Sequence, residues 1–526
     1  MKFKNFLIAA VCISAVNFFA NAVEAEESMK SDFRPVNALG LGEYNLEFNP
    51  IGFDSRTAEI EGKSISFRAY ENIVYVKNPK NAQYQSLNIY IPQNYLDGKS
   101  INGYTSKTAP IFMPTGVGGY MPSLAQTPDD RMGGSTILKA LERGYVVVSP
   151  AIRGRTTVAD SDSKLYVGKA PAFVVDFKAA VRFLRANRDR LPAGDVEKIV
   201  SNGTSAGGAL SALLGATGNA PDYEKYLREI GAAQERDDIF ASSDYCPITN
   251  LDHADAAYEW IFHDVLEAHQ SNRQAPPPDM KNPPPDDSKK DRPMNAPVEN
   301  QSATPLTDIE KKVSDILRAE FPIYVNSLGL KDPSTGELLL LDANGEGSFK
   351  NFVKSKYIES AQDALNSGES LKDLDWIVLN GKKVVDVDLD KYAVYATRMK
   401  APPAFDKLDL SSGENDEFAT ESNEPRHFTR TSKIHETKSG EIADADQIRL
   451  MNPMNFIGRE DVQVAKHFRI RHGAIDRDTS LAIPSILALK LMNSGIDVDF
   501  YSPWNRGHAG DYDLPELFDW IDSICK

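Results

Sequence analysis

The 526-residue sequence has few cysteines, few histidines and, after its first twenty residues, no apolar run long enough to cross a membrane. Three cysteines, Cys12, Cys246 and Cys525, are too few for a disulfide framework; Cys246 and Cys525 either pair or remain separate buried thiols. Basic residues are also scarce, with 59 Lys and Arg against 75 Asp and Glu and a formal net charge of −16. These shortages argue against a nucleic-acid partner and against membrane insertion.

The first residues have the order of a secretory leader. Lys2 and Lys4 precede an apolar run from Phe6 to Phe19, and small residues follow at Ala20-Asn21-Ala22. This pattern predicts a signal peptide over residues 1–22, with an alternative cut after Ala25. The apolar run is too short for a comfortable membrane span, so we expect an exported, soluble protein of the periplasm or the medium.

Short apolar segments alternate with helical patterns in two stretches, 30–266 and 400–526. Strands are expected over 86–92, 110–114, 144–149, 196–201, 464–471 and 497–501. Helices are expected over about 174–188, 209–214 and 480–493. This alternation predicts an α/β fold in which one mostly parallel sheet is covered by helices on both faces.

The residues between these stretches, 267–399, have a different composition. Eight prolines lie between Pro276 and Pro297, among charged and amide residues, which predicts a flexible tract over 274–302. Further along, 309–321 and 349–365 have helical patterns, whereas 337–342 and 376–391 look like short strands. We expect an inserted lid domain above the sheet.

The hexamer Gly203-Thr204-Ser205-Ala206-Gly207-Gly208 lies between the strand at 196–201 and the helix at 209–214. A Gly-x-Ser-x-Gly sequence in that position is typical of a nucleophile elbow, a sharp turn that holds the serine hydroxyl above the sheet. Ser205 is therefore the candidate nucleophile.

A serine hydroxyl needs a base and an orienting acid, which in this fold follow the serine in the order acid, then histidine. Of the eight histidines, only His508 follows the last predicted strand; the alternative is a histidine of a surface loop. Asp476 and Asp478 share the loop after the strand at 464–471. Asp476 lies nearer the strand and is the better acid, whereas Asp478 could cap the next helix, or both could merely solvate a turn.

Two segments are expected to form an oxyanion hole. One backbone amide comes from the residue after the serine, Ala206. The other comes from the glycine-rich loop after the strand at 110–114, where Gly118 and Gly119 allow close approach to a carbonyl group. No Gly-Lys-Ser/Thr follows this loop, which argues against phosphate binding.

Five motifs together carry a family resemblance. They are the elbow hexamer, Val117-Gly118-Gly119-Tyr120, Tyr245-Cys246-Pro247-Ile248-Thr249, Arg471-His472-Gly473-Ala474-Ile475-Asp476-Arg477-Asp478-Thr479 and Pro503-Trp504-Asn505-Arg506-Gly507-His508-Ala509-Gly510-Asp511-Tyr512-Asp513. Over about 40–265 and 395–525 the chain resembles bacterial tannases, the tannin acyl hydrolases of the α/β-hydrolase superfamily. The proline-rich tract has no counterpart in this resemblance.

The resemblance implies a triad of Ser205, Asp476 and His508. It also implies a pocket in which Lys400, Glu414 and Asp478 meet the phenolic hydroxyls of a galloyl group; charged residues in such a polar loop could equally be solvated.

We therefore expect an exported serine esterase that hydrolyses galloyl esters through an acyl-enzyme and releases gallic acid, with a small phenolic ester as its partner and no metal or organic cofactor. A feruloyl or other phenolic-acid carboxylesterase is the alternative. A secreted serine peptidase and a non-catalytic polyphenol-binding protein are further ones.

Overall fold

The computed structural model describes residues 33–130, 133–160, 162–269 and 303–526. The predicted signal peptide at 1–22 lies outside these residues, as does the whole predicted proline-rich tract at 274–302. Among the described helices, none is both long enough and apolar enough to cross a membrane.

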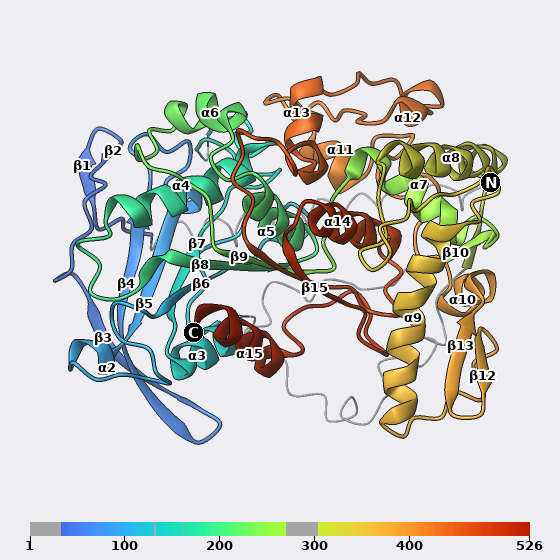
Figure 1. Ribbon diagram of the computed structural model, residues 1–526. Coiled ribbons are helices and arrows are strands. Elements are labelled where there is room, and N and C mark those ends of the chain that lie inside the picture. Colours follow the sequence, from blue (N-terminus) through green and yellow to red (C-terminus); the bar gives the residue numbers. More distant parts are fainter. Residues whose placement is uncertain (1–32, 131–132, 161, 270–302) are drawn as a thin grey trace, which may run out of the picture.

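A nine-stranded sheet runs through the centre of the molecule in the order β15-β14-β9-β8-β6-β7-β5-β4-β3 (Figure 1). Neighbouring strands are parallel from β15 to β7 and antiparallel from β7 to β3. The strands are β3 (Asp54–Ile60), β4 (Lys63–Val74), β5 (Ser86–Pro92), β6 (Pro110–Pro114), β7 (Val146–Pro150), β8 (Asp195–Thr204), β9 (Ala241–Tyr245), β14 (His467–Arg471) and β15 (Asp497–Tyr501). The predicted α/β fold with a mostly parallel sheet is confirmed.

Helices cover both faces of this sheet. In Figure 1, α3 (Gly134–Arg143) and α15 (Leu514–Cys525) lie below the strands, and α4 (Ala172–Ala186), α5 (Ala206–Ala216) and α14 (Ala482–Asn493) lie above them. Every residue of α5 is buried, because its alanines, leucines and glycines pack directly on the strands. Helix α4 buries two cations, Lys178 and Arg182, which both contact the carboxylate of Asp237.

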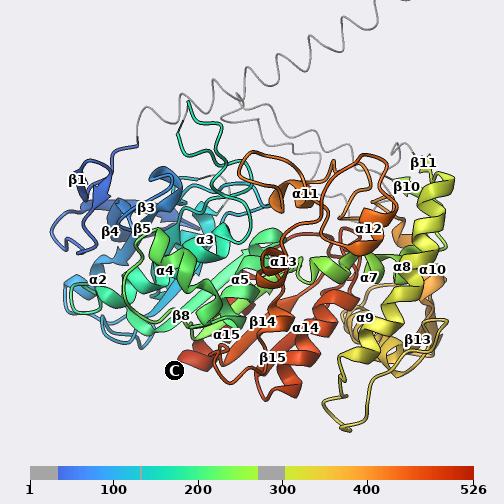
Figure 2. The same cartoon turned by 90° about the horizontal axis from the view of Figure 1, so that it is seen from above.

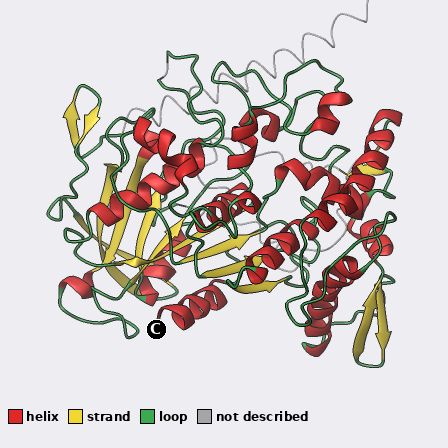
Figure 3. Cartoon of the chain, turned by 45° about the horizontal axis from the view of Figure 1, so that its top comes forward, coloured by secondary structure: helices red, strands yellow, loops and turns green. Residues whose placement is uncertain are grey.

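Residues 303–399 contribute no strand to the central sheet. The segment holds α8 (Asp308–Ser327), α9 (Ser348–Asn366), the hairpin of β12 (Ile377–Asn380) and β13 (Lys383–Val387), and α10 (Leu389–Ala396). In two perpendicular views these elements gather at the end of the molecule opposite β3 and β4 (Figures 1 and 2). The hairpin stands apart from the central sheet (Figure 3). The division of the chain into a catalytic domain and a lid domain stays a prediction.

One expected strand of this segment is wrong. Residues 337–342 form no strand and contribute only an isolated bridge between Lys331 and Leu338. Their backbone is held instead by Asn326, whose side chain bonds both the N–H and the carbonyl of Leu341. The expected helices at 309–321 and 349–365 lie within α8 and α9.

The smaller elements surround the sheet. They are β1 (Ala38–Gly40), β2 (Glu43–Tyr44), β10 (Glu267–His269), β11 (Ala303–Pro305), α2 (Gln93–Leu96), α6 (Glu224–Glu229), α7 (Leu251–Phe262), α11 (Gly413–Glu417), α12 (Arg430–Ile434) and α13 (Ala445–Leu450). Cys246 and Cys525 are both buried and free, so the alternative in which they form a disulfide is wrong.

Candidate active site

Ser205 lies at the tight turn between β8 and α5, with a strained backbone of positive φ, at φ 63° and ψ −123°. A side chain at Gly203 would place its Cβ 2.2 Å from the carbonyl oxygen of Gly207. At Gly208 it would come within 2.5 Å of the oxygen of Tyr245. Only glycine fits these two positions, so the local sequence fixes the strained turn that presents the serine.

His508 joins the other two predicted catalytic residues. Its Nε2 lies 2.8 Å from the Oγ of Ser205, and its Nδ1 lies 2.8 Å from the Oδ2 of Asp476. The backbone N–H of Asp478 donates to the other carboxylate oxygen of Asp476 at 2.8 Å. The structure thus brings the serine, the histidine and the acid together in one hydrogen-bonded row, with Asp476 and not Asp478 facing the imidazole.

The charges of this row reinforce one another. Burial by itself would raise the pKa of Asp476, but the positive charge of His508 holds that pKa well below its usual range. Burial lowers the pKa of His508, and the facing carboxylate of Asp476 more than offsets this and raises it well above its usual value. The acid therefore stabilises an imidazolium, the form that His508 takes when it accepts a proton.

The glycine-rich loop after β6 lies against the elbow. A Cβ at Gly207 would be 2.6 Å from the carbonyl oxygen of Val117, and Gly118 and Gly119 are exposed beside it. Within the described residues, no acceptor pairs with the N–H of Gly118, Gly119 or Ala206. These amides have the character that an oxyanion hole requires, because they are free to donate to a substrate oxygen.

The three residues expected to hold the galloyl hydroxyls lie near one another. The Nζ of Lys400 is 2.9 Å from the Oδ1 of Asp478 and 4.0 Å from the ring centre of Phe405. Burial raises the pKa of Glu414, although the charge of Lys400 acts in the opposite direction. In the described structure, no side-chain contact joins Glu414 to Lys400 or Asp478 directly. Asp478 does not cap the following helix, because α14 begins at Ala482.

Arg155 connects the glycine-rich loop to α11, the helix that carries Glu414. Its Nε donates to the carbonyl oxygen of Gly119 at 3.0 Å, and its Nη1 contacts the carboxylate of Asp416 at 2.6 Å. Lys169 approaches the same carboxylate at 2.6 Å. Sequence reasoning missed this link, since a single arginine carries no motif.

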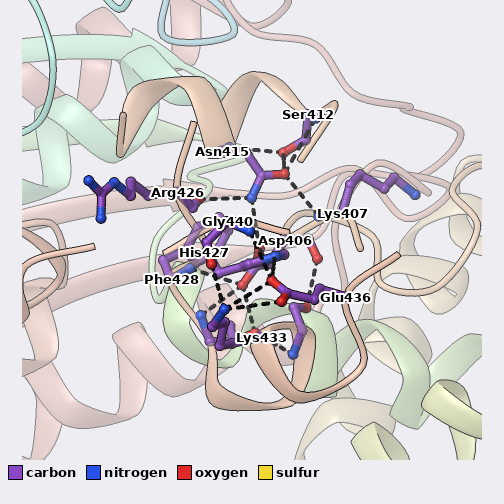
Figure 4. Close-up of polar contacts among 12 residues, drawn as sticks. Asp406, Lys407, Ser412, Asn415, Arg426, His427, Phe428, Lys433, Glu436 and Gly440 are labelled. Carbon is purple, nitrogen blue, oxygen red and sulfur yellow. Dashed lines mark hydrogen bonds and ion pairs between the residues drawn. The ribbon is translucent and has the colours of Figure 1, made fainter. Parts of the chain in front are cut away.

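A buried carboxylate, Asp406, holds the segment around α11 in place (Figure 4). It accepts hydrogen bonds from Asn415 Nδ2 at 2.7 Å and from the backbone N–H of Phe428 at 3.0 Å, and its Oδ1 lies 2.8 Å from His427 Nδ1. Asn415 also closes a capping box with Ser412 at the start of α11. Glu414 therefore lies on a short helix directly before Asn415, whose side chain is held by the buried carboxylate of Asp406.

The segment at 303–399 contacts both loops that carry the triad. The hydroxyl of Tyr392 donates to the carbonyl oxygen of Ala474 at 2.9 Å, close to Asp476. Trp504, in the loop of His508, stacks on Trp376 with ring centres 5.7 Å apart. These aromatic contacts give the acid and histidine loops a rigid support outside the central sheet.

Comparison with known proteins shows similarity along nearly the whole chain. A tannin acyl hydrolase from Lactobacillus plantarum is 44% identical with a TM-score of 0.84, covering 91% of this chain and 99% of that one. A tannase from Fusobacterium nucleatum is 48% identical with a TM-score of 0.84, covering 92% and 100%. A tannin acyl hydrolase in complex with ethyl gallate is 44% identical with a TM-score of 0.83, covering 91% and 99%.

Two shorter matches point to esterases. Residues 105–277 match the BD-FAE family model. Esterase LipC from Mycobacterium tuberculosis is 46% identical over 59 residues, which is 11% of this chain and only 14% of that protein.

The fold and its serine-centred site, together with these matches, define a carboxylic-ester hydrolase of the α/β-hydrolase class. The long matches identify the family within this class, because they cover almost all of this chain and of each tannase chain. The chain belongs to the bacterial tannases.

Proposed function

We propose that the protein hydrolyses galloyl esters, such as alkyl gallates and tannins, through an acyl-enzyme on Ser205, and releases gallic acid. The observation that carries the proposal is the row in which His508 lies 2.8 Å from both Ser205 and Asp476. The ethyl gallate complex of a similar tannin acyl hydrolase supports the galloyl group as the acyl part of the substrate.

In the proposed reaction the Oγ of Ser205 attacks the ester carbonyl carbon while His508 Nε2 takes its proton. The amides of Ala206 and of Gly118 or Gly119 donate to the oxyanion. The tetrahedral intermediate collapses, and His508 returns the proton to the leaving alcohol. His508 then takes a proton from a water molecule, which attacks the carbonyl carbon of the galloyl-enzyme. The second tetrahedral intermediate collapses as His508 returns the proton to the Oγ of Ser205, and gallic acid is released.

The galloyl ring is proposed to be recognised by its three hydroxyls. The carboxylates of Glu414 and Asp478 accept from phenols, and the ammonium of Lys400 donates to a phenolic oxygen. Ferulate, with one phenol and a methoxyl group, would leave part of this set unused. That difference favours galloyl esters over the feruloyl alternative.

The test is hydrolysis of methyl gallate, with the liberated gallic acid quantified by chromatography. Ser205→Ala should abolish turnover and leave the melting temperature nearly unchanged, whereas Ser523→Ala, at an exposed serine of α15, should leave activity unchanged. Methyl ferulate, a peptide ester and a binding titration run in parallel separate the phenolic-acid esterase, the peptidase and the binding protein. Near-normal activity of the Ser205→Ala variant would remove Ser205 from the mechanism.

We also propose that the protein is exported. The support is the sequence order of the leader alone: two lysines, an apolar run and small residues within 1–22. Cell fractionation tests this: esterase activity of the full chain should appear outside the cytoplasm, and deletion of 2–22 should retain it inside.

A further inference from the structure

A buried thiol lies beside the proposed triad. Cys246 directly follows β9, its N–H donates to the carbonyl oxygen of Arg471 at 2.6 Å, and its Sγ lies 3.4 Å from the carbonyl oxygen of Ala509. Its sulfur, a carboxylate oxygen of Asp476 and a ring nitrogen of His508 all lie within 4.8 Å of one another. The ester-hydrolysis steps give this thiol no task.

A thiolate, an imidazole and a carboxylate are together the donor set that zinc prefers in proteins. In a tetrahedral zinc site with bonds of about 2.0 Å to nitrogen and oxygen and about 2.3 Å to sulfur, ligand atoms lie roughly 3.3–3.6 Å apart. His508 Nδ1 and Asp476 Oδ2 are now 2.8 Å apart. Shifts of roughly 1 Å in these ligand atoms would convert the cluster into such a site.

A second observation points to a missing ligand at the same place. His472 is fully buried, and neither of its ring nitrogens has a hydrogen-bond partner within the described part of the chain. Its Nε2 lies 3.7 Å from the Oδ2 of Asp476. A buried imidazole without side-chain partners is costly, and this one lies against Asp476 as an outer neighbour of the three-residue cluster.

We infer that Cys246, His508 and Asp476, backed by His472, form a latent site for a thiophilic divalent cation such as Zn²⁺, and that its occupation switches the enzyme off. Binding releases one proton to solvent, from the thiol of Cys246, while the single proton of the neutral His508 moves from Nδ1 to Nε2. No electron is transferred.

The tautomer of His508 explains the loss of activity. A cation that also binds Asp476 must take the nitrogen facing it, Nδ1. A neutral imidazole bound to metal at Nδ1 carries its proton on Nε2. Nε2 then faces Ser205 as a donor and no longer accepts the serine proton. This inhibition rests on the proposed function, whereas metal binding itself does not.

The experiment uses the chain lacking 1–22, in which Cys246 and Cys525 are the two thiols. Zn²⁺ is titrated into methyl gallate hydrolysis by the wild type, by Cys246→Ser and by Cys525→Ser as the matched control. Since loss of an outer-shell partner already weakens metal sites by about 10–100-fold, loss of the thiolate should weaken inhibition at least about 100-fold. In the wild type, kcat should fall and KM should change little, because the cation binds away from Lys400 and Glu414.

Co²⁺ absorption supplies a readout that needs no turnover. A thiolate-to-cobalt charge-transfer band should appear in the wild type, in Cys525→Ser and in the inactive Ser205→Ala, and should be missing in Cys246→Ser. Cys525→Ser keeps Cys246 as its single thiol, so its spectrum decides the matter even if Cys246→Ser does not fold. Absence of the band there, or equal Zn²⁺ inhibition of the wild type and Cys246→Ser, overturns the inference.

Discussion

The galloyl pocket makes a quantitative prediction about methyl benzoate, which lacks all three ring hydroxyls. In the free protein Lys400 and Asp478 already satisfy one another at 2.9 Å, and their side chains are 20% and 21% exposed. Within the part of the chain that the structure describes, the Glu414 side chain has no hydrogen-bond or ion-pair partner. Methyl benzoate would therefore leave the ion pair intact and would leave only the Glu414 carboxyl unsatisfied.

The size of the preference for methyl gallate follows from how each of the three side chains is paired before the substrate binds. A hydrogen bond to a charged group contributes about 1.5–3 kcal/mol. Discounted for an existing partner and for solvent screening, the hydroxyls that meet Lys400 and Asp478 add about 1 kcal/mol each. The hydroxyl that meets Glu414 adds about 2 kcal/mol. The sum of about 4 kcal/mol predicts that methyl gallate exceeds methyl benzoate by about 10³ in kcat/KM.

The assay compares both esters in the wild type and in Glu414→Ala. The variant should lose about 30-fold in kcat/KM for methyl gallate, from the loss of about 2 kcal/mol, and should hydrolyse methyl benzoate at the wild-type rate. Glu424→Ala, an exposed carboxylate of the same segment, is the control and should change neither. Equal kcat/KM of the two esters in the wild type, or equal losses for both in Glu414→Ala, would refute the galloyl pocket.

Three further predictions concern the site and its support. Asp476→Asn should lower kcat by about 10⁴ with a modest change in KM, because the amide favours the wrong tautomer of His508; the reverse pattern, with Asp478→Asn the more damaging, would exchange the two roles. Gly203→Ala should abolish activity and lower the melting temperature, since its Cβ meets a backbone oxygen at 2.2 Å; an active variant would show that the turn tolerates a side chain. Burial acts to raise the pKa of Asp237, but the charges of Lys178 and Arg182 outweigh it and depress that pKa, so its stabilising contribution is present above the ordinary aspartate pKa of about 4 and is lost as the pH falls below it. Urea unfolding between pH 7 and pH 3 should therefore depend less on pH in Asp237→Asn, which should also be less stable by about 3–5 kcal/mol at pH 7; an unchanged pH dependence would contradict the assignment.

Apolar composition and turn chemistry were enough to predict part of the sheet. Strands β5, β6 and β15 have the expected bounds because each is a short run with clear boundaries. Strand β9 was missed because its sequence, Ala-Ser-Ser-Asp-Tyr, looks like a turn. In the fold both serines are buried, and the Ser242 hydroxyl lies 2.9 Å from Ser211 of α5 and donates to Asp244 at 2.6 Å. Only the packed structure supplies the partners that make a polar strand stable.

At the candidate active site, too, some residues could be predicted from local sequence and others only from the fold. Ser205, Asp476 and His508 could be proposed because the turn glycines and the chain order of such residues are visible in sequence. Whether Asp476 or Asp478 faces the imidazole was decided locally by distance from the strand. The contacts of Arg155 and Asp406 could not be predicted, because each joins residues far apart in sequence through single side chains that have no characteristic spacing.

The order of strands in the central sheet also determines which strand edges stay uncovered while the chain is being synthesised. Strand β9 is flanked by β8 and β14, and β14 is synthesised only after the whole segment that follows β9 has been added. Until β14 arrives, one edge of β9 has no neighbouring strand, and such an edge is prone to pair with other chains. His508 comes later still. A nascent chain therefore carries an open sheet edge and an incomplete triad, and the final part of the sequence supplies first the strand that covers this edge and then the catalytic histidine.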